Sequence, residues 1–409
     1  MTAAQLANLI SLRPQGVSDS SYIDRVLKAL RTHLGLDVAF VAQFRADDRV
    51  FTHVDADGQA PINPGDTLSH DAGYCQRVVD GLLPELIADT SLCPLAMELP
   101  ETTALPIGAH LSVPILLSDG RLYGTLCCFG YEADPTLGER DIQMMRVFAD
   151  LVGGQLDSEL NRVRDRVQKH RRISAILASD QPSIVFQPIL AVQTLELCGW
   201  ECLARFNTQP PRTPDLWFRE AAEAGLGVDL ELRAIEHAIS ALAALPEHTY
   251  LALNCSPQLV YSGRLNPILE HLPARRLVLE ITEHAAVADY KRLEQALAPL
   301  RQRGVRLSID DTGAGYASMR HILELSPDVI KLDMSITQGI DHDFKRRALA
   351  SSLIAFARET GSSVVAEGVE TEQELETLQA LGVHKVQGYL LGRPQPLADA
   401  LVAARKKLR

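Results

Sequence analysis

The stretch V-R-L-S-I-D-D-T-G-A-G-Y-A-S-M-R-H-I-L-E-L-S-P-D-V-I-K-L-D, residues 305–333, decides the fold of the C-terminal half. Two short apolar runs of strand type, Arg306–Ile309 and Val329–Leu332, flank a glycine-containing loop and a helical segment. Charged residues stand at the ends of both runs, namely Asp310, Asp311, Lys331 and Asp333. Buried strands have no packing reason to end on charge, whereas active sites lie at the C-terminal strand ends of a parallel barrel. An isolated Asp-Asp pair is more often a solvated turn or a helix N-cap, so the neighbouring segments decide between these interpretations.

Strand-type runs alternate with helical patterns throughout the sequence after Ser179. We expect strands at Ile184–Ile189, Leu195–Phe206, Tyr250–Asn254, Leu277–Thr282, Arg306–Asp310, Val329–Asp333, Ser363–Glu367 and Lys385–Leu391. Eight strands with interleaved helices over about 230 residues are typical of a (β/α)₈ TIM-like barrel. A doubly wound open sheet is the alternative, but the sequence contains neither a G-x-G-x-x-G nor a G-x-x-x-x-G-K-[ST] motif.

Most of the predicted strands carry a polar residue near the end. These residues are Glu201, Asn254, Glu280, Asp310, Asp311, Lys331, Glu367 and Gln387. Carboxylates that converge on a barrel mouth repel one another unless cations lie between them. Oxygen ligands select hard ions such as Mg²⁺ or Mn²⁺ over Zn²⁺, and a two-metal site suits the attack of water on a phosphodiester. The pattern therefore predicts a metal-dependent phosphohydrolase.

The composition of the 409 residues is that of an ordinary soluble protein of two to three domains. The formal net charge of −12 argues against binding of a nucleic-acid polymer or a membrane surface. We expect no membrane span, and Met1–Gly16 lacks the order of a signal peptide. The seven cysteines form no C-x-x-C pair and are expected to be reduced, mostly buried thiols in a cytoplasmic protein.

The N-terminal half has a different, α+β pattern. A helical stretch at Tyr22–Leu34 precedes short strand-like runs that are separated by Asp/Gly turns. The expected strands are Val38–Phe44, Val50–Val54, Leu111–Leu117 and Leu122–Phe129. With its L-Y-G-T-L-C-C-F run at 122–129, this half resembles a GAF domain over residues 18–158. The resemblance implies an antiparallel sheet and a pocket for an unknown small ligand. A bilin or redox role for Cys75, Cys127 and Cys128 is the alternative to buried core thiols.

A long helix is expected to connect the two halves. Its apolar residues step by three or four positions, at Met145, Phe148, Val152, Leu156, Leu160, Val163 and Val167. Such a stripe suits pairing with the same helix of a second chain, so we expect a homodimer. We predict a sensor domain at 18–158, a linker helix at 159–178 and a catalytic domain at 179–409.

The C-terminal half resembles the EAL family of cyclic-di-GMP phosphodiesterases over residues 180–405. Eight motifs carry the resemblance: F-Q-P-I (186–189), E-C-L-A-R (201–205), L-N-C-S (253–256), L-E-I-T-E (279–283), D-D-T-G-A-G-Y-A-S (310–318), I-K-L-D (330–333), A-E-G-V-E (366–370) and Q-G-Y-L-L-G-R-P (387–394). The resemblance implies hydrolysis of cyclic-di-GMP to linear pGpG, with two Mg²⁺ or Mn²⁺ ions per active site.

The resemblance also implies a role for individual residues. The first metal ion would be held by Glu201, Asn254, Glu280 and Asp310. Asp310 would bridge to a second ion, which Asp311 and Glu367 also bind. Lys331 would orient the attacking water or help to deprotonate it, and Glu283 would tie down the loop Asp311–Ser318. The substrate would be contacted by Gln187, Leu203, Arg205, Asp333, Glu370, Gln387 and Pro394, with Arg205 on a phosphate.

Two departures from the family pattern concern regulation and activity. The name-giving E-A-L reads E-C-L here, and Thr312 and Ala314 replace the Phe and Thr usual in the D-D-F-G-T-G loop. No G-G-D-E-F cyclase motif occurs, so the chain is expected to degrade the messenger rather than make it. The alternatives are a catalytically silent cyclic-di-GMP receptor, and a GAF half that serves only as an interaction module.

Overall fold

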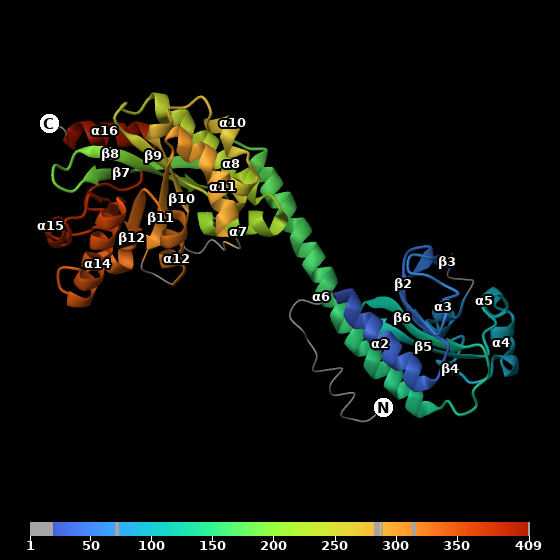
Figure 1. The fold of residues 1–409 in the computed structure, drawn as a ribbon. Helices are drawn as coiled ribbons and strands as arrows, with labels where there is room; N and C mark the ends of the chain where they lie inside the picture. The colour runs from blue at the N-terminus through green and yellow to red at the C-terminus, as the bar shows by residue number, and fades with distance from the viewer. Residues whose placement is uncertain (1–18, 70–72, 282–286, 288, 313–315, 408–409) are drawn as a thin grey trace. The chain divides into compact units, whose positions relative to one another are not determined.

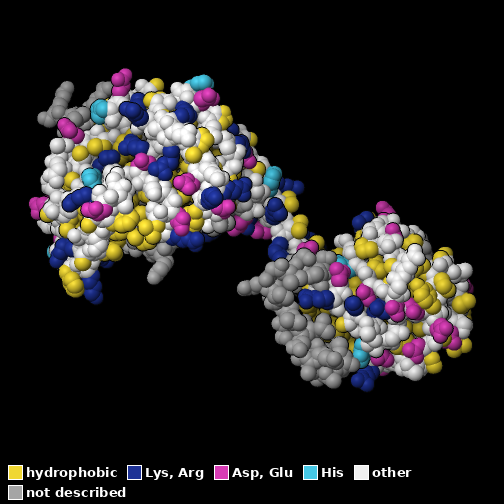
Figure 2. All heavy atoms as spheres, in the orientation of Figure 1, with side chains coloured by type: hydrophobic (Ala, Val, Ile, Leu, Met, Phe, Trp, Pro, Cys, Tyr) yellow, Lys and Arg dark blue, Asp and Glu magenta, His cyan; other side chains and the backbone are white. Residues whose placement is uncertain are grey.

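The computed structural model describes residues 19–69, 73–281, 287, 289–312 and 316–407. The chain divides into two compact units, and the boundary in the sequence falls between Asp165 and Arg166, within helix α6 (Glu139–Leu177) (Figure 1). The predicted linker helix, residues 159–178, lies almost wholly within α6. No helix among these residues is both long and apolar enough to cross a membrane. Basic and acidic side chains are interspersed over the visible face of each unit (Figure 2).

The first unit contains a six-stranded antiparallel sheet of order β3-β2-β1-β6-β5-β4. Its strands are β1 (Val38–Phe44), β2 (Asp48–Ala56), β3 (Thr67–Ser69), β4 (Leu86–Ile87), β5 (Ala109–Leu116) and β6 (Leu122–Gly130). Its helices are α2 (Asp19–Leu34), α3 (Tyr74–Val79), the short 3₁₀ helix η2 (Thr90–Leu92), α4 (Pro94–Met97), α5 (Pro100–Ala104) and the first part of α6. The predicted α+β architecture is confirmed, and the short strands β3 and β4 are additional to the prediction.

Each face of this sheet carries a buried apolar cluster. Because side chains alternate along each strand, adjacent residues contribute to opposite faces. On one face, Cys128 packs with residues of α2 and α6. On the other face, Cys127 packs with α3 and the segments around α4. Two adjacent cysteines of β6 therefore belong to two different apolar clusters.

Part of the apolar stripe of α6 covers the sheet of its own unit, whereas the sequence predicts that the stripe pairs with a second chain. Met145, Phe148, Val152 and Leu156 are buried in the core of the first unit, so they are not available for pairing with a second chain. Gly153 allows this packing, because a Cβ atom there would lie 2.5 Å from the Leu116 carbonyl oxygen. Farther along the helix, Val163 and Val167 are 56% and 45% exposed. An amphipathic helix that covers its own sheet and a helix that pairs with a partner share the same three-four period.

The second unit is a closed eight-stranded barrel of order β10-β11-β12-β13-β14-β7-β8-β9. Its strands are β7 (Ser183–Ala191), β8 (Leu197–Arg205), β9 (Tyr250–Asn254), β10 (Leu277–Ile281), β11 (Arg306–Thr312), β12 (Val329–Leu332), β13 (Ser363–Ala366) and β14 (Lys385–Val386). The predicted eight-stranded barrel is confirmed, with one detail added. Strand β7 runs antiparallel to both of its neighbours, because the short turn between β7 and β8 has no room for the crossover that parallel strands need.

Helices surround the barrel and bury its outward-facing residues (Figure 1). They are α7 (Pro214–Ala224), α8 (Gly227–Ser240), α9 (Pro257–Tyr261), α10 (Leu265–Leu269), α11 (Tyr290–Arg303), α12 (Tyr316–Leu325), α13 (Met334–Thr337), α14 (Phe344–Thr360), α15 (Glu372–Leu381) and α16 (Leu397–Lys407), with the 3₁₀ helices η3 (Ala241–Ala243) and η4 (Ala274–Arg276). Left-handed glycines directly follow several of them, for example Gly225 after α7 and Gly361 after α14. These C-caps end each helix without the steric cost that a Cβ would bring.

Candidate active site

The side chains inside the barrel form layers. Toward the C-terminal ends of the strands, an apolar layer is followed by a charged layer. The apolar layer includes Ala252, Val278, Val329 and Val365, which form one buried cluster. Because successive side chains of a strand alternate in direction, the residue two positions further along each strand points the same way. Those positions are occupied by Asn254, Glu280, Lys331 and Glu367, and Asp310 follows the buried Ser308 in the same manner.

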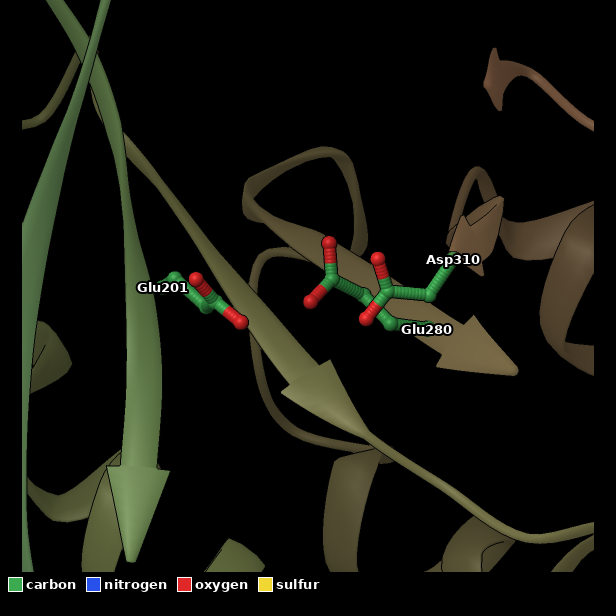
Figure 3. Close-up of side chains that lie close together, drawn as sticks. All are labelled: Glu201, Glu280 and Asp310. Atoms are coloured by element: carbon green, nitrogen blue, oxygen red, sulfur yellow. The ribbon is translucent and has the colours of Figure 1, made fainter. Parts of the chain in front are cut away.

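Three buried carboxylates converge in this layer. Glu201, Glu280 and Asp310 each offer an oxygen, and these atoms lie within 4.8 Å of one another. Figure 3 shows the three side chains reaching toward a common space from three strands, β8, β10 and β11. The three residues are far apart in the sequence, and they come together because the strands that carry them belong to one closed barrel.

Lys331 lies at the centre of the group. Its Nζ is 3.4 Å from Glu201 Oε1, 3.2 Å from Glu280 Oε2, 3.0 Å from Asp310 Oδ1 and 2.5 Å from Glu367 Oε1. The lysine side chain is only 1% exposed. One buried ammonium therefore faces four carboxylates, and the negative charges outnumber the positive charge.

The pKa values of these groups follow from burial and from their mutual charges. Burial raises the pKa of Glu280 to about 8; the charge of Lys331 opposes this shift, and the charges of Glu201 and Asp310 add to it. Burial also raises the pKa of Glu367 well above its usual range. For Lys331, burial favours the neutral amine, but the carboxylates outweigh burial and hold its pKa well above the usual range. Lys331 is therefore held as an ammonium, and the raised pKa values of Glu280 and Glu367 reflect the cost of placing several buried carboxylates around one cation.

Two glutamines extend the polar network. Gln387 Nε2 donates to Gln187 Oε1 at 3.0 Å and also donates to Glu201 Oε2. Gln187 Nε2 in turn donates to the Gly392 carbonyl oxygen at 3.1 Å. Gln187 is opposite Glu201 in the register of the antiparallel β7–β8 pair. The network fixes the orientation of the Glu201 carboxylate.

A cavity of about 640 Å³ opens beside the carboxylates. Its lining includes Glu201, Leu203, Arg205, Asn254 and Asp310, five of the residues predicted from the sequence. Arg205 is exposed, and its Nη1 donates to its neighbour's carbonyl, Ala204 O, at 2.8 Å. The volume is in the range of sites for small molecules and cofactors.

Asp333, Glu370 and Pro394 do not line the cavity, and other predicted residues lie outside the described part of the chain. Asp333 caps α13, accepting from Ser335 N at 2.9 Å, and Pro394 is half-buried. Glu370 is exposed, and its backbone N–H donates to the Glu374 carboxylate. Glu283 and Ala314 lie outside the described residues, as does the side chain of Asp311, although the Asp311 backbone belongs to β11.

Sequence reasoning missed several residues of the cavity wall. Asp215 and Phe218 of α7 and Glu231 of α8 line the cavity. Glu231 accepts from Ser256 N at 2.9 Å, and burial raises its pKa. These residues occupy ordinary helical positions, so the chain pattern carries no signal that could have identified them.

The donor set fits a hard divalent cation. The three carboxylates are buried and lie within reach of a single ion. Glu201 and Asp310 also line the cavity, together with Asn254 and its amide. Mg²⁺ and Mn²⁺ prefer such oxygen ligands. A divalent ion would also supply the positive charge that a single lysine does not provide.

Comparison with known proteins agrees with this architecture. The family model of the EAL domain matches residues 170–394, and that of the GAF domain matches residues 21–156. An uncharacterised signalling protein of Caulobacter vibrioides is 31% identical over 307 residues, which are 73% of this chain and 37% of that protein. The cyclic di-GMP phosphodiesterase PdeF of Escherichia coli is 30% identical over 251 residues, 58% of this chain and 33% of PdeF.

A solved structure of the PaMucR phosphodiesterase in complex with c-di-GMP has a TM-score of 0.51 and 31% sequence identity, covering 57% of this chain and 99% of that one. The chain spans only about a third of the length of the two curated relatives, at 37% and 33%. The EAL match nevertheless extends over more than half of the chain, residues 170–394 of 409. The chain therefore belongs to the EAL domain family and carries a GAF domain ahead of its EAL domain.

Proposed function

We propose that the barrel unit is a metal-dependent phosphodiesterase that hydrolyses cyclic-di-GMP to linear pGpG. The convergence of Glu201, Glu280, Asp310 and Glu367 on Lys331 carries the proposal. A buried carboxylate cluster of this kind is costly for folding, and binding of divalent cations supplies a reason to keep it. The names of PdeF and PaMucR, a cyclic di-GMP phosphodiesterase and a phosphodiesterase in complex with c-di-GMP, support the choice of substrate.

The residues that would hold the ions follow from the site. In the proposal Glu201, Asn254, Glu280 and Asp310 hold one Mg²⁺ or Mn²⁺ ion, and Asp310, Asp311 and Glu367 hold a second. Bound divalent ions supply an activated water and neutralise the charge that develops on the phosphate. The Gln387–Glu201 hydrogen bond keeps one ligand in a fixed orientation before any ion binds, as partners of metal ligands generally do.

Lys331 acts on the nucleophile and on the charge of the site. As an ammonium it donates hydrogen bonds to the four carboxylates that surround it. In the proposal it orients these carboxylates and the attacking water. Orientation of the water and help in its deprotonation both stay open as roles implied by the family resemblance.

The cavity beside the carboxylates is the proposed substrate site. Arg205 is the exposed cation on its wall and can grip a phosphate with its planar fork. We assign the remaining substrate contacts to Gln187, Leu203, Asp333, Glu370, Gln387 and Pro394. Gln187 and Gln387 are already oriented by their mutual hydrogen bond, which lowers the cost of ordering them on binding.

We also propose that the GAF unit regulates the barrel and that the chain acts as a homodimer. Val163 and Val167 support a helix contact, since they are exposed and lie four residues apart on α6. A double change to glutamate at these two positions leaves the core of the first unit intact, unlike a change at the buried Leu156. The variant should be monomeric by light scattering, and an unchanged dimer contradicts the assigned contact.

The experiment that tests the activity is incubation of the purified chain with cyclic-di-GMP and Mg²⁺ or Mn²⁺, with separation of the products by chromatography. Accumulation of pGpG that stops on chelation supports the phosphodiesterase. Tight binding of cyclic-di-GMP without any product would instead establish a catalytically silent receptor.

A further inference from the structure

Two cysteines of the GAF unit lie in contact although they are far apart in the sequence. Cys75 belongs to α3 and Cys127 to β6, and their Sγ atoms are 3.4 Å apart. Both side chains are completely buried in the same apolar cluster. All seven cysteines of the chain are free thiols in this structure. The two sulfurs must approach by little more than 1 Å to reach the bond length of about 2.05 Å in a disulfide.

A buried arginine distinguishes this contact from ordinary packing of core thiols. Arg49 of β2 is 1% exposed, and its Nη1 donates to Cys75 Sγ at 2.5 Å. Its Nη2 is 2.6 Å from Glu101 Oε2. Gly73 makes room for this pair, because a Cβ at that position would lie 2.0 Å from Arg49 Nη2. A guanidinium is expensive to bury without charged partners, and here the partners are a carboxylate and a thiol.

The surroundings give the two thiols different chemical characters. Burial disfavours the Cys75 thiolate, but the hydrogen bond with Cys127 and the charge of Arg49 outweigh burial and lower the pKa of Cys75 to about 7. Burial raises the pKa of Cys127 well above its usual range. Cys127 Sγ also lies 3.2 Å from Thr125 Oγ1 and 3.2 Å from Ser112 Oγ, two hydroxyl groups within hydrogen-bond distance. Cys75 is thus the thiol that ionises readily, and Cys127 the thiol that keeps its proton.

The remaining titratable groups near the pair do not change this assignment. Glu101 is bound to Arg49, and its Oε2 also accepts from Tyr74 N at 3.1 Å. His110 of β5 stacks on the Tyr74 ring at 4.2 Å. Burial, followed by the charge of Arg49, lowers the pKa of His110 to about 3, so this ring is neutral at physiological pH.

We propose that Cys75 and Cys127 form a redox-active dithiol that a hydroperoxide oxidises to an intrachain disulfide. This modification site lies in the GAF unit, is separate from the carboxylate site of the barrel, and does not depend on the phosphodiesterase assignment. It gives the GAF unit two covalent states that differ beside a buried ion pair.

The reaction proceeds in two balanced steps. The Cys75 thiolate attacks one oxygen of the hydroperoxide; the S–O bond forms, the O–O bond breaks, and the leaving oxygen takes a proton to become water or an alcohol. Cys127 then attacks Sγ of the resulting sulfenic acid; the S–S bond forms, the S–O bond breaks, and hydroxide leaves as water with the Cys127 proton. Overall two thiols lose two electrons and two protons, and one hydroperoxide is reduced. Reduction by an external dithiol reverses the change.

Cys128 provides a matched control. It follows Cys127 directly and is equally buried, but it faces the other side of the sheet and lies 3.9 Å from Met145 Sδ. Burial raises the pKa of the Cys128 thiol. It shares the burial and the chain position of Cys127 but lacks a cysteine partner and the contact with Arg49.

The test treats the reduced full-length chain with hydrogen peroxide, alkylates the remaining thiols after denaturation, and identifies linked peptides by mass spectrometry. The wild-type chain should lose two of its seven thiols and yield one peptide pair that joins Cys75 to Cys127. Cys128→Ser should behave like the wild type. Cys127→Ser should form no linked pair and should accumulate a sulfenic acid at Cys75 that dimedone traps.

Three results would overturn the proposal. These are retention of all seven thiols by the wild-type chain, a linked pair that joins other cysteines, and equal loss of the linked pair in Cys128→Ser. The wild-type measurement decides the matter even where a cysteine variant fails to fold.

Discussion

Asp310→Asn removes one negative charge from the centre of the proposed metal site and keeps the volume of the side chain. Asp310 Oδ1 lies 3.0 Å from Lys331 Nζ. At that separation, with an effective dielectric constant of about 20, the attraction is about 5.5 kcal/mol, which is an upper limit for the loss of folding free energy. The amide oxygen still accepts from Lys331, so we expect the barrel to remain folded. Loss of the proposed bridging ligand should lower kcat/KM at least about 100-fold, or about 2.7 kcal/mol in the transition state.

The matched control for this prediction is Ser308→Ala. Ser308 lies two residues earlier on β11, points to the same side of the strand, and is fully buried. Its Oγ has no hydrogen-bond partner among the described residues, so the alanine variant should be as stable as the wild type and as active. Steady-state turnover of cyclic-di-GMP and Mn²⁺ titration by calorimetry measure both variants. Near-normal turnover by Asp310→Asn, or an equal loss in Ser308→Ala, would refute the metal-ligand assignment.

Three further predictions concern the substrate cavity and the GAF unit. Arg205→Ala should raise KM for cyclic-di-GMP at least about tenfold with little change in Mn²⁺ affinity, because Arg205 is on the cavity wall; an unchanged KM shows that another cation holds the phosphate. Gly153→Ala should destabilise the GAF unit by about 1–3 kcal/mol, because its Cβ would lie against the Leu116 carbonyl oxygen. Gly154→Ala should stabilise the helix by up to about 1 kcal/mol, because there is open space around Gly154. Hydrogen exchange of β5 and β6 measures both variants, and equal effects would contradict the close packing of Gly153. Burial gives His110 a folded-state pKa of about 3, below its unfolded value of about 6.5, so the free energy of unfolding of the GAF unit should fall by up to about 1.4 kcal/mol per pH unit below pH 6.5. Hydrogen exchange at pH 7, 6 and 5 should show that His110→Leu lacks this dependence on pH, and an unchanged dependence would assign it to another group.

The sequence predicted the barrel and its charged layer because strand periodicity is a local property. Glu280 and Lys331 each follow a buried valine by two residues, and that spacing is visible in the chain. The sequence pattern does not predict the direction of β7, since the shortness of the turn between β7 and β8 is evident only once both strand boundaries are known. The predicted pairing surface on α6 is wrong for the buried residues Met145, Phe148, Val152 and Leu156, because a three-four period does not identify the surface that apolar residues cover.

Contacts across the GAF unit lay beyond sequence reasoning for a different reason. Cys75 and Cys127 are 52 residues apart, and no periodic pattern connects a helix residue with a strand residue at such a distance. The burial of Arg49 runs against the usual exposure of arginine. It became apparent only when the fold placed Glu101 and Cys75 beside it.

The carboxylates around Lys331 are proposed to serve metal-dependent hydrolysis of cyclic-di-GMP. The most direct measurement is the product formed from cyclic-di-GMP by the purified full-length chain, with Mg²⁺ or Mn²⁺ and with a chelator in parallel. We expect linear pGpG as the product with either metal ion, and a rate of pGpG formation with the chelator that is less than about one hundredth of the rate without it. Binding of cyclic-di-GMP with no pGpG formed in the presence of either ion, or hydrolysis at the same rate with the chelator, would contradict it.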